Sequence, residues 1–300
     1  MHHSKKVILV LSVSLLIFVV AISGCMEKPS SAVSIQDMIN NASSGGILHI
    51  DSGIYHGNIT LSKSIALIGE DKDTTIIEGN GGNSVVVITA DNCTFQGFTV
   101  TSKNSSEDTI GIDVHSSHNI IANSNISHCK YGVYLHLRTE NNTILGNELS
   151  NNQYAIYLIL SSMNNISKND IFLSKSNGIK LEFHSNSNEF YNNKISDNLC
   201  GLNLVNSYDN KIFNSDISNN KIGIDICCSS KNNTICRNIF INNSQHNAID
   251  KYNNSWDDES YGNYWDDYKG TDENGDGIGD VPYDIPDGNN QDRHPLMNQP

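Results

Sequence analysis

One phrase recurs along this chain with a period of about 23 residues, and this repeat limits the folds that the chain can adopt. The phrase reads N-x-I-x-x-[NS]-x-I, then five to seven residues, then [GA]-I-x-I, with other apolar residues at some of the Ile positions. It begins at Asn119, Asn142, Asn164, Asn188, Asn210 and Asn233, and its small residue stands at Gly132, Ala155, Gly178, Gly201, Gly223 and Ala248. Self-similarity at a fixed period is typical of stacked-repeat architectures.

The repeat unit is built from short strands and not from helices. Its apolar residues stand two apart in small clusters, as in strands with alternating faces. Asn, Ser and Gly interrupt the unit every five or six residues, and none of them favours a helix interior. Units of about three strands, stacked ~4.8 Å apart, predict an all-β parallel β-helix with continuous inner aliphatic columns. The predicted inner residues are Ile121/Ile126/Val133/Leu135, Ile144/Leu149/Ile156/Leu158, Ile166/Ile171/Ile179/Leu181, Phe190/Ile195/Leu202/Leu204 and Ile212/Ile217/Ile224/Ile226.

Asn recurs for two structural reasons that the repeat suggests. Bends between strands often need a positive φ, which Asn and Gly tolerate better than other residues. Equivalent Asn side chains one turn apart can also hydrogen-bond to each other as a ladder. The alternative is N-glycosylation, because N-x-[ST] contexts occur at Asn41, Asn58, Asn92, Asn104, Asn125, Asn141, Asn165, Asn232, Asn242 and Asn253.

Both ends of such a coil expose strand edges and core, so each end needs a cover. Residues 34–42 predict a capping helix that begins at Ser34, with Asp37 three residues later and an apolar stripe. We therefore expect residues 34–252 to form the β-helix with its N-terminal cap. Residues 253–300 change to an aromatic and Asp-rich composition that includes both tryptophans, Trp256 and Trp265, and this segment predicts an irregular C-terminal cap.

The first 25 residues have the features of a targeting segment. Two lysines precede the apolar run 7–20, and Ile22-Ser23-Gly24 stands directly before Cys25. Small residues before a Cys resemble the lipobox of prokaryotic lipoproteins, which implies lipid attachment at Cys25 and a short tether over residues 26–33. The alternative is an uncleaved signal anchor. Either interpretation predicts an extracytoplasmic, membrane-anchored domain on the cell surface or in the periplasm.

Charge and one acidic segment bear on the partners. The net charge of −14 excludes nucleic acid as an expected partner, because phosphate binding calls for a basic stripe.

A segment near the C-terminus resembles a calcium loop. Its oxygen ligands stand at alternate positions, and Gly stands at the sharp turn, but Tyr283 occupies the twelfth position, where an acidic ligand is expected. The candidate Ca²⁺ ligands are Asp272, Asn274, Asp276, Ile278, Asp280 and Asp284; the alternative is a metal-free Asp/Gly turn.

The sequence also resembles a known family. Its Asn-rich repeat resembles the carbohydrate-binding and sugar-hydrolase (CASH) repeats of right-handed parallel β-helix proteins. The segment 262–268, GNYWDDY, followed by DGIGD at 276–280 and by Pro282-Tyr283, is similar to the end of the NosD family. NosD proteins are periplasmic β-helix proteins associated with copper-site maturation of nitrous-oxide reductase, and NosD-like proteins also occur on archaeal surfaces. The resemblance implies the fold and, as one possibility, copper and protein partners.

Candidate ligand-binding residues follow from the register of the repeat. His115 and His136 each follow the last inner residue of a turn, so they are expected one turn apart; this pair is a candidate copper site or a stacked surface pair. Tyr131 and Tyr134 are expected to stack on Tyr154 and Tyr157, as a sugar-binding surface or as a tyrosine ladder.

No catalytic residue is assigned from the sequence. Asp113 with His115 could form an acid/base pair, but no basic column is expected beside them. Three functions stay open: a non-enzymatic binding protein for a polysaccharide or envelope component, a NosD-type accessory factor for a copper enzyme, and a polysaccharide lyase or epimerase. The first is preferred, because the membrane anchor, the Asn-rich turns and the tyrosines all fit it.

Overall fold

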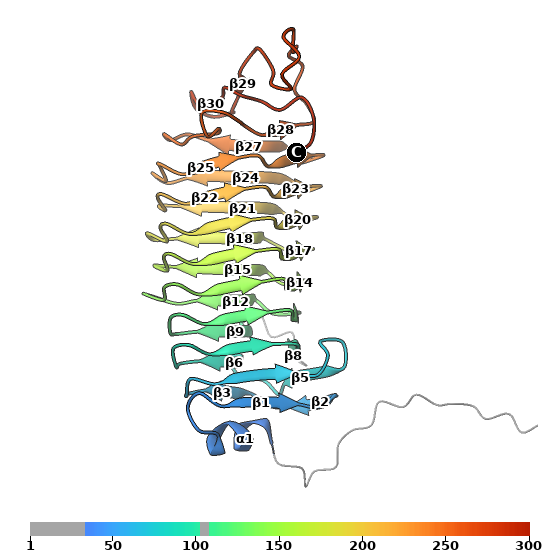
Figure 1. Cartoon of the computed structure of the whole chain (residues 1–300), viewed down its shortest axis with the longest axis vertical. Helices are drawn as coiled ribbons and strands as arrows, with labels where there is room; N and C mark the ends of the chain where they lie inside the picture. The colour runs from blue at the N-terminus through green and yellow to red at the C-terminus, as the bar shows by residue number, and fades with distance from the viewer. Residues whose placement is uncertain (1–33, 103–107) are drawn as a thin grey trace, which may run out of the picture.

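The chain winds into one long coil of short strands. The computed structural model describes residues 34–102 and 108–300. Its strands form three parallel sheets that run the length of the molecule, and each turn of the repeat contributes one strand to each sheet. The result is a right-handed parallel β-helix of about nine turns (Figure 1). The predicted fold class is therefore confirmed.

The elements follow the repeat in strict order. The first sheet contains β1 (Ile47–Ile50), β4 (Ala66–Gly69), β7 (Thr94–Gln96), β10 (Ile120–Ala122), β13 (Thr143–Leu145), β16 (Asn165–Ser167), β19 (Glu189–Tyr191), β22 (Lys211–Phe213) and β25 (Thr234–Cys236). The second contains β2 (Gly53–His56), β5 (Thr75–Gly79), β8 (Thr99–Ser102), β11 (Asn125–Ser127), β14 (Glu148–Ser150), β17 (Asp170–Phe172), β20 (Lys194–Ser196), β23 (Asp216–Ser218), β26 (Ile239–Ile241) and β28 (Tyr264–Trp265). The third contains β3 (Ile59–Leu61), β6 (Ser84–Ile88), β9 (Ile110–Val114), β12 (Tyr131–Leu135), β15 (Tyr154–Ile159), β18 (Asn177–Glu182), β21 (Cys200–Val205), β24 (Ile222–Cys227) and β27 (His246–Asp250).

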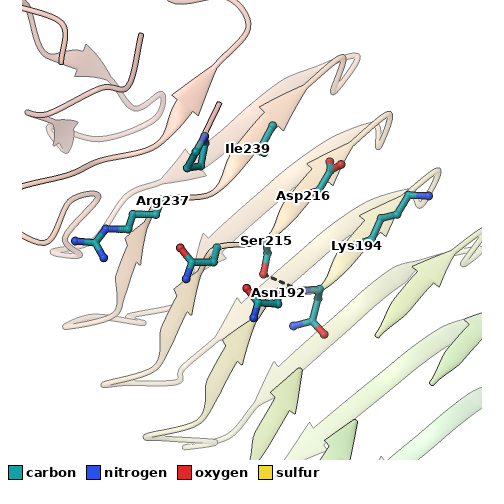
Figure 2. Close-up of a pocket in the computed structure, with 9 residues that line it drawn as sticks. Asn192, Lys194, Ser215, Asp216, Arg237 and Ile239 are labelled. Carbon is teal, nitrogen blue, oxygen red and sulfur yellow. Dashed lines mark hydrogen bonds between the residues drawn. The ribbon is translucent and has the colours of Figure 1, made fainter. Parts of the chain in front are cut away.

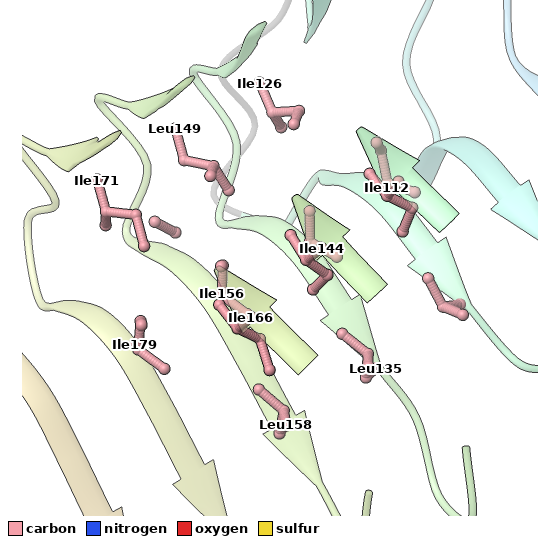
Figure 3. Packing of buried hydrophobic residues seen from close by; sticks show 14 of the residues in the cluster. Ile112, Ile126, Leu135, Ile144, Leu149, Ile156, Leu158, Ile166, Ile171 and Ile179 are labelled. Carbon is pink, nitrogen blue, oxygen red and sulfur yellow. The ribbon is translucent and has the colours of Figure 1, made fainter. Parts of the chain in front are cut away.

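The core consists of the aliphatic columns that the repeat predicts. Ile121, Ile144 and Ile166 pair in register along the first sheet, and each is fully buried. Figure 3 shows side chains of successive turns, such as Leu135 and Leu158, pointing into the same interior. Each fully buried aliphatic side chain contributes about 1.5–3 kcal/mol. The inner columns therefore supply most of the stabilisation of the solenoid.

Buried Asn ladders hold the corners between the sheets. At the corner before the first sheet, the Oδ1 of Asn142 accepts hydrogen bonds from the backbone N and the Nδ2 of Asn119, at 2.9 and 3.0 Å. The same ladder continues through Asn164, Asn188, Asn210, Asn233 and Asn254. The other two corners have ladders of the same kind, as between Asn147 and Asn169 and between Asn198 and Asn220. The predicted Asn ladder is therefore confirmed.

Both ends of the coil are covered. The helix α1 (Ile35–Asn41) lies over the first turn (Figure 1), with Ile35 and Ile39 buried. Its Ser34 side chain accepts a hydrogen bond from the backbone N of Asp37 at 3.1 Å, as expected of a helix N-cap. At the other end, the rings of Trp265 and Phe240 stack with centroids 4.3 Å apart, so aromatic residues close the core there.

The segment after β27 is irregular. It contains β28 and the short antiparallel pair β29 (Tyr283–Asp284) and β30 (Gln291–Asp292). The predicted signal segment 1–25, its Cys25 and the tether 26–33 lie outside the described residues. Within the described residues, no helix is long and apolar enough to cross a membrane.

Candidate functional site

The outer face of the third sheet carries the most chemically distinctive surface of the described chain. Near its start, each long strand of this sheet has a small buried residue. In β12, this residue is Gly132, and the outward residues on either side of the buried Gly132 and Val133 are Tyr131 and Tyr134. A Cβ on Gly132 would lie 2.5 Å from the carbonyl oxygen of Ala155 in the next turn, so a side chain at this position would collide with the next turn. Outward residues of successive turns then form columns, in which Tyr134 pairs with Asp113 on one side and Tyr157 on the other.

Asp113, His115 and His136 converge on this face where β9 and β12 lie side by side. The Oδ1 of Asp113 lies 2.8 Å from the Nε2 of His136 and 3.1 Å from the Nε2 of His115. The two imidazoles stack, with centroids 4.1 Å apart, as the repeat register predicted. In the described part of the chain, the potential metal-ligand atoms of these three side chains all lie within 4.8 Å of one another. We call it the Asp–His cluster.

The carboxylate of the Asp–His cluster is buried but kept charged. Burial alone would raise the pKa of Asp113, but the contact with His136, the hydrogen bond from Ser84 and the electrostatic interaction with the two imidazoles outweigh it and lower the pKa. The Ser84 Oγ donates to Asp113 Oδ2 at 2.7 Å. The other oxygen, Oδ1, and the Nε2 of His136 have no hydrogen-bond partner among the described residues, although they lie 2.8 Å apart. Their close approach therefore lacks the alignment of a hydrogen bond.

Four tyrosines continue the face beyond the Asp–His cluster. Tyr131 stacks on Tyr134, Tyr154 and Tyr157, with centroids 5.0 to 5.4 Å apart. Lys130 lies over the ring of Tyr131, and Lys180 lies over that of Tyr154. The ring faces are thus largely occupied by one another and by ammonium groups, which leaves ring edges and hydroxyls toward solution. We call Tyr131, Tyr134, Tyr154 and Tyr157 the tyrosine cluster.

An ion pair between Lys180 and Glu182 borders the tyrosine cluster. The Tyr157 hydroxyl donates to the carboxylate of Glu182, and Lys180 Nζ lies 2.6 Å from Glu182 Oε1. Burial, followed by the hydrogen bond and negative charge of Glu182, raises the pKa of Tyr157, so this phenol stays protonated at neutral pH. The tyrosine cluster is therefore bordered by the Glu182 carboxylate and the ammonium groups of Lys130 and Lys180.

Sequence reasoning found most of this site but missed two carboxylates. The pairing of His115 with His136 and the stacking of the tyrosines followed from the repeat register. Asp113 was expected only as an acid/base partner of His115, and Glu182 was not among the candidate residues. The D-x-H order of residues 113–115 had paired Asp113 with His115, because residues two apart on one strand share a face, but the approach of Asp113 to His136 was not expected.

The candidate calcium loop has the turn that its sequence predicted. Asp272 accepts backbone hydrogen bonds from Gly275 and Gly277, at 2.7 and 2.9 Å, and Gly277 has a φ of +86°. Asp280 accepts one from the backbone N of Glu273 at 2.7 Å, while Asp284 accepts one from the Gln291 side chain at 2.7 Å. Ca²⁺ binding by Asp272, Asn274, Asp276, Ile278, Asp280 and Asp284 stays a prediction.

A separate hollow lies at the corner between the first and second sheets. It has a volume of about 410 Å³, and Asn192, Lys194, Ser215, Asp216, Arg237 and Ile239 contribute to its walls (Figure 2). Lys194 and Asp216 pair in register on β20 and β23, and Arg237 is held 2.7 Å from Asp258. The hollow combines opposite charges without a converging ligand set, so it is a weaker candidate than the third sheet.

Solved structures with similar folds share the coil and little sequence. The structure of pectate lyase Pel9A is 15% identical, with a TM-score of 0.56, and the match covers 75% of this chain and 74% of that one. The DFA-IIIase from Arthrobacter chlorophenolicus A6, in complex with DFA-III, is 12% identical, with a TM-score of 0.61 and coverages of 78% and 68%. At these identities the likeness shows the fold alone.

Sequence relatives give the family. The "Probable ABC transporter binding protein NosD" of Pseudomonas aeruginosa is 34% identical over 82 residues, which are 27% of this chain and 19% of that protein. The protein of the same description from Stutzerimonas stutzeri is 33% identical over the same length. The match thus spans about a fifth of the length of these curated relatives. A family model described as "Periplasmic copper-binding protein (NosD)" matches residues 39–270, most of the chain, and the protein therefore belongs to the NosD family.

Proposed function

We propose that the protein is a membrane-anchored, extracytoplasmic binding protein that holds a polysaccharide or another envelope component against the outer face of its third sheet. The family is periplasmic, which agrees with an extracytoplasmic role. The observation that carries the proposal is the tyrosine cluster with its flanking Lys130, Lys180 and Glu182. Phenol hydroxyls, ammonium groups and a carboxylate are suited to hydrogen-bonding a hydroxyl-rich chain.

The shape of the sheet also supports this role. Successive turns are ~4.8 Å apart, so an extended polymer along the coil axis would meet equivalent side chains at regular intervals. Because the tyrosine rings pack face to face, the polymer would contact ring edges and hydroxyls, with hydrogen bonds to Lys130 and Lys180. The pectate lyase and the DFA-IIIase share the coil, and the proposed role is binding without catalysis.

The tyrosine cluster can be tested by a double substitution. We expect Tyr134→Ala with Tyr157→Ala to weaken binding at least tenfold on an array of envelope polysaccharides, since both hydroxyls and their packing are lost. The matched control is Tyr191→Ala with Phe213→Ala, which removes another stacked pair, 5.1 Å apart, on the first sheet. Binding that survives the first pair of substitutions, or falls equally with both, would remove the tyrosine cluster as the binding surface.

A second candidate is an accessory role in the maturation of a copper enzyme, as in nitrous-oxide reductase assembly. The family match over residues 39–270 favours it, because that family is described as copper-binding. Deleting the gene should then lower the copper content of a periplasmic copper enzyme in the same cell. An unchanged copper content in the purified enzyme would exclude this role for the enzyme examined.

A further inference from the structure

We propose that Asp113, His115 and His136 form a binding site for one divalent first-row transition metal ion, with Cu²⁺ bound most tightly. This inference goes beyond the proposed envelope-binding role and does not depend on it. It assigns a ligand set to residues of this chain: one carboxylate oxygen and two imidazole nitrogens.

The distances fit a shared metal ion. Ligand atoms that each lie about 2.1 Å from a metal, at angles of about 90–110°, are separated by about 2.9–3.4 Å. The Asp113 Oδ1 to His136 Nε2 and Asp113 Oδ1 to His115 Nε2 distances are 2.8 and 3.1 Å. The three atoms come from two adjacent turns, with Asp113 on β9 and the histidines directly after β9 and β12, and they lie within 4.8 Å of one another, so only small side-chain shifts are needed to bind an ion between them.

Two buried polar atoms without hydrogen-bond partners favour a bound metal ion over a simple ion pair in the Asp–His cluster. Asp113 is only 6% exposed, yet its Oδ1 has no hydrogen-bond partner among the described residues, and neither has the buried Nε2 of His136. Buried polar atoms without partners are costly and rare in native proteins. A metal ion would satisfy both atoms at once, together with the Nε2 of His115.

The surroundings orient the ligands. The Ser84 Oγ donates to the second oxygen of Asp113 and fixes the carboxylate plane, as outer-shell partners of metal ligands commonly do. The ring of Tyr134 lies 4.0 Å from that of His136 and restricts its rotation. The side chains of His115 and His136 are 40% and 28% exposed, so an ion from solution can reach the site.

The ligand types indicate the class of metal. Imidazole suits Zn²⁺, Cu²⁺ and Ni²⁺, whereas Ca²⁺ and Mg²⁺ prefer all-oxygen sites. For a given nitrogen and oxygen site, affinity rises from Mn²⁺ through Ni²⁺ to Cu²⁺ and falls again at Zn²⁺. Three protein ligands also leave positions open for water or for an exchange partner.

The test uses the full-length protein with Cu²⁺, Ni²⁺, Zn²⁺ and Mn²⁺ salts, and no polysaccharide. A background of His2→Ala with His3→Ala removes the imidazoles at the N-terminus of the sequence. We expect equilibrium dialysis with metal analysis to give one ion per chain, with Cu²⁺ tightest. The electron paramagnetic resonance spectrum of bound Cu²⁺ should show coupling to two imidazole nitrogens.

Variants separate ligands from bystanders. Ser84→Ala should weaken Cu²⁺ binding by about 10–100-fold, and His115→Ala or His136→Ala should weaken it further and leave one coupled nitrogen. Asp113→Asn keeps the shape of the side chain and should also weaken binding. His128→Ala, which removes an exposed histidine between β11 and β12, should leave Cu²⁺ affinity and the number of coupled nitrogens unchanged.

Two results would overturn the proposal. One is Cu²⁺ uptake that persists in the His115→Ala, His136→Ala double variant while its thermal unfolding matches that of the parent. The other is a spectrum of the parent without two coupled nitrogens. Because no polysaccharide is present, failure here leaves the proposed envelope-binding role to be judged by its own array experiment.

Discussion

Single residues explain why Asn recurs in this sequence. The two roles that the sequence suggested, a positive φ and a side-chain ladder, fall on adjacent residues of the same corner. Asn192 has a φ of +54° and is exposed, whereas Asn193 is buried in a ladder. The first role is open to many residues, since Lys168 and Leu173 also have positive φ. The second needs an amide that accepts and donates at once.

A ladder Asn should therefore be much harder to replace than its neighbour. Asn188 accepts hydrogen bonds from the backbone N and the Nδ2 of Asn164 and donates to Ser161. We expect Asn188→Ala to lower the free energy of unfolding by about 3 kcal/mol, because several buried polar groups lose partners.

The matched control is Asn192→Gly, which keeps the positive φ accessible and should change stability by less than about 0.5 kcal/mol. Urea denaturation followed by circular dichroism measures both. Equal effects of the two substitutions would contradict the division of roles.

Among the elements, the C-terminal cap has the most unusual electrostatics. Asp292 of β30 accepts hydrogen bonds from the backbone N of Asn263 and the indole of Trp265, at 2.7 and 2.8 Å. Burial outweighs these bonds and raises the pKa of Asp292 to about 6. The sequence predicted an aromatic and Asp-rich cap, but it could not predict which carboxylate is buried, because that depends on how irregular loops pack.

This raised pKa predicts a cap that is weakened at higher pH. Because its folded-state pKa lies above its unfolded value, protonated Asp292 stabilises the folded state. This stabilisation is fully present below pH 4 and is lost as the pH rises through about 6. The shift corresponds to about 3 kcal/mol. Urea denaturation at pH 4, 5, 6 and 7.5 measures the free energy of unfolding of the parent and of Asp292→Asn. We expect the Asp292-dependent fall in this free energy between pH 4 and 7.5 in the parent and not in the variant. Parallel pH profiles of the two proteins would refute the assignment.

The loop 272–280 predicts a calcium effect on the same cap. Bound Ca²⁺ would stabilise the folded state in proportion to the logarithm of its concentration. We expect the melting temperature of the cap to rise by several degrees with millimolar Ca²⁺ and not with Mg²⁺, and the rise to vanish in Asp272→Asn with Asp276→Asn. Differential scanning calorimetry after chelation measures it; an identical melting temperature with and without Ca²⁺ would support the metal-free turn.

At the scale of the whole molecule, a lipid anchor at Cys25 would determine where the proposed binding face can act. If Cys25 carries lipid, Cys25→Ser should move the protein from the membrane to the soluble extracytoplasmic fraction and remove labelling by a palmitate analogue. Cys228→Ser, at an exposed cysteine of the β-helix, is the control and should change neither. Membrane association of Cys25→Ser without lipid label would instead indicate an uncleaved signal anchor.

The repeat predicted the coil almost completely, because the turns from Asn119 onward carry equivalent apolar inner residues and a corner Asn or Ser. It predicted the site in part. Register alone placed His115 beside His136, since residues one period apart must stack in a solenoid. The convergence of Asp113 on both imidazoles depends on side-chain rotamers and on the hydrogen bond from Ser84, which no periodicity encodes.

The most direct test is a crystal structure of the protein with Cu²⁺, with anomalous scattering measured at the copper edge. The account predicts one strong anomalous peak about 2.0–2.3 Å from Asp113 Oδ1, His115 Nε2 and His136 Nε2, on a coil in which these histidines occupy adjacent turns. A peak bound elsewhere, or a register that separates the two histidines, would contradict both the site and the stacking on which it rests.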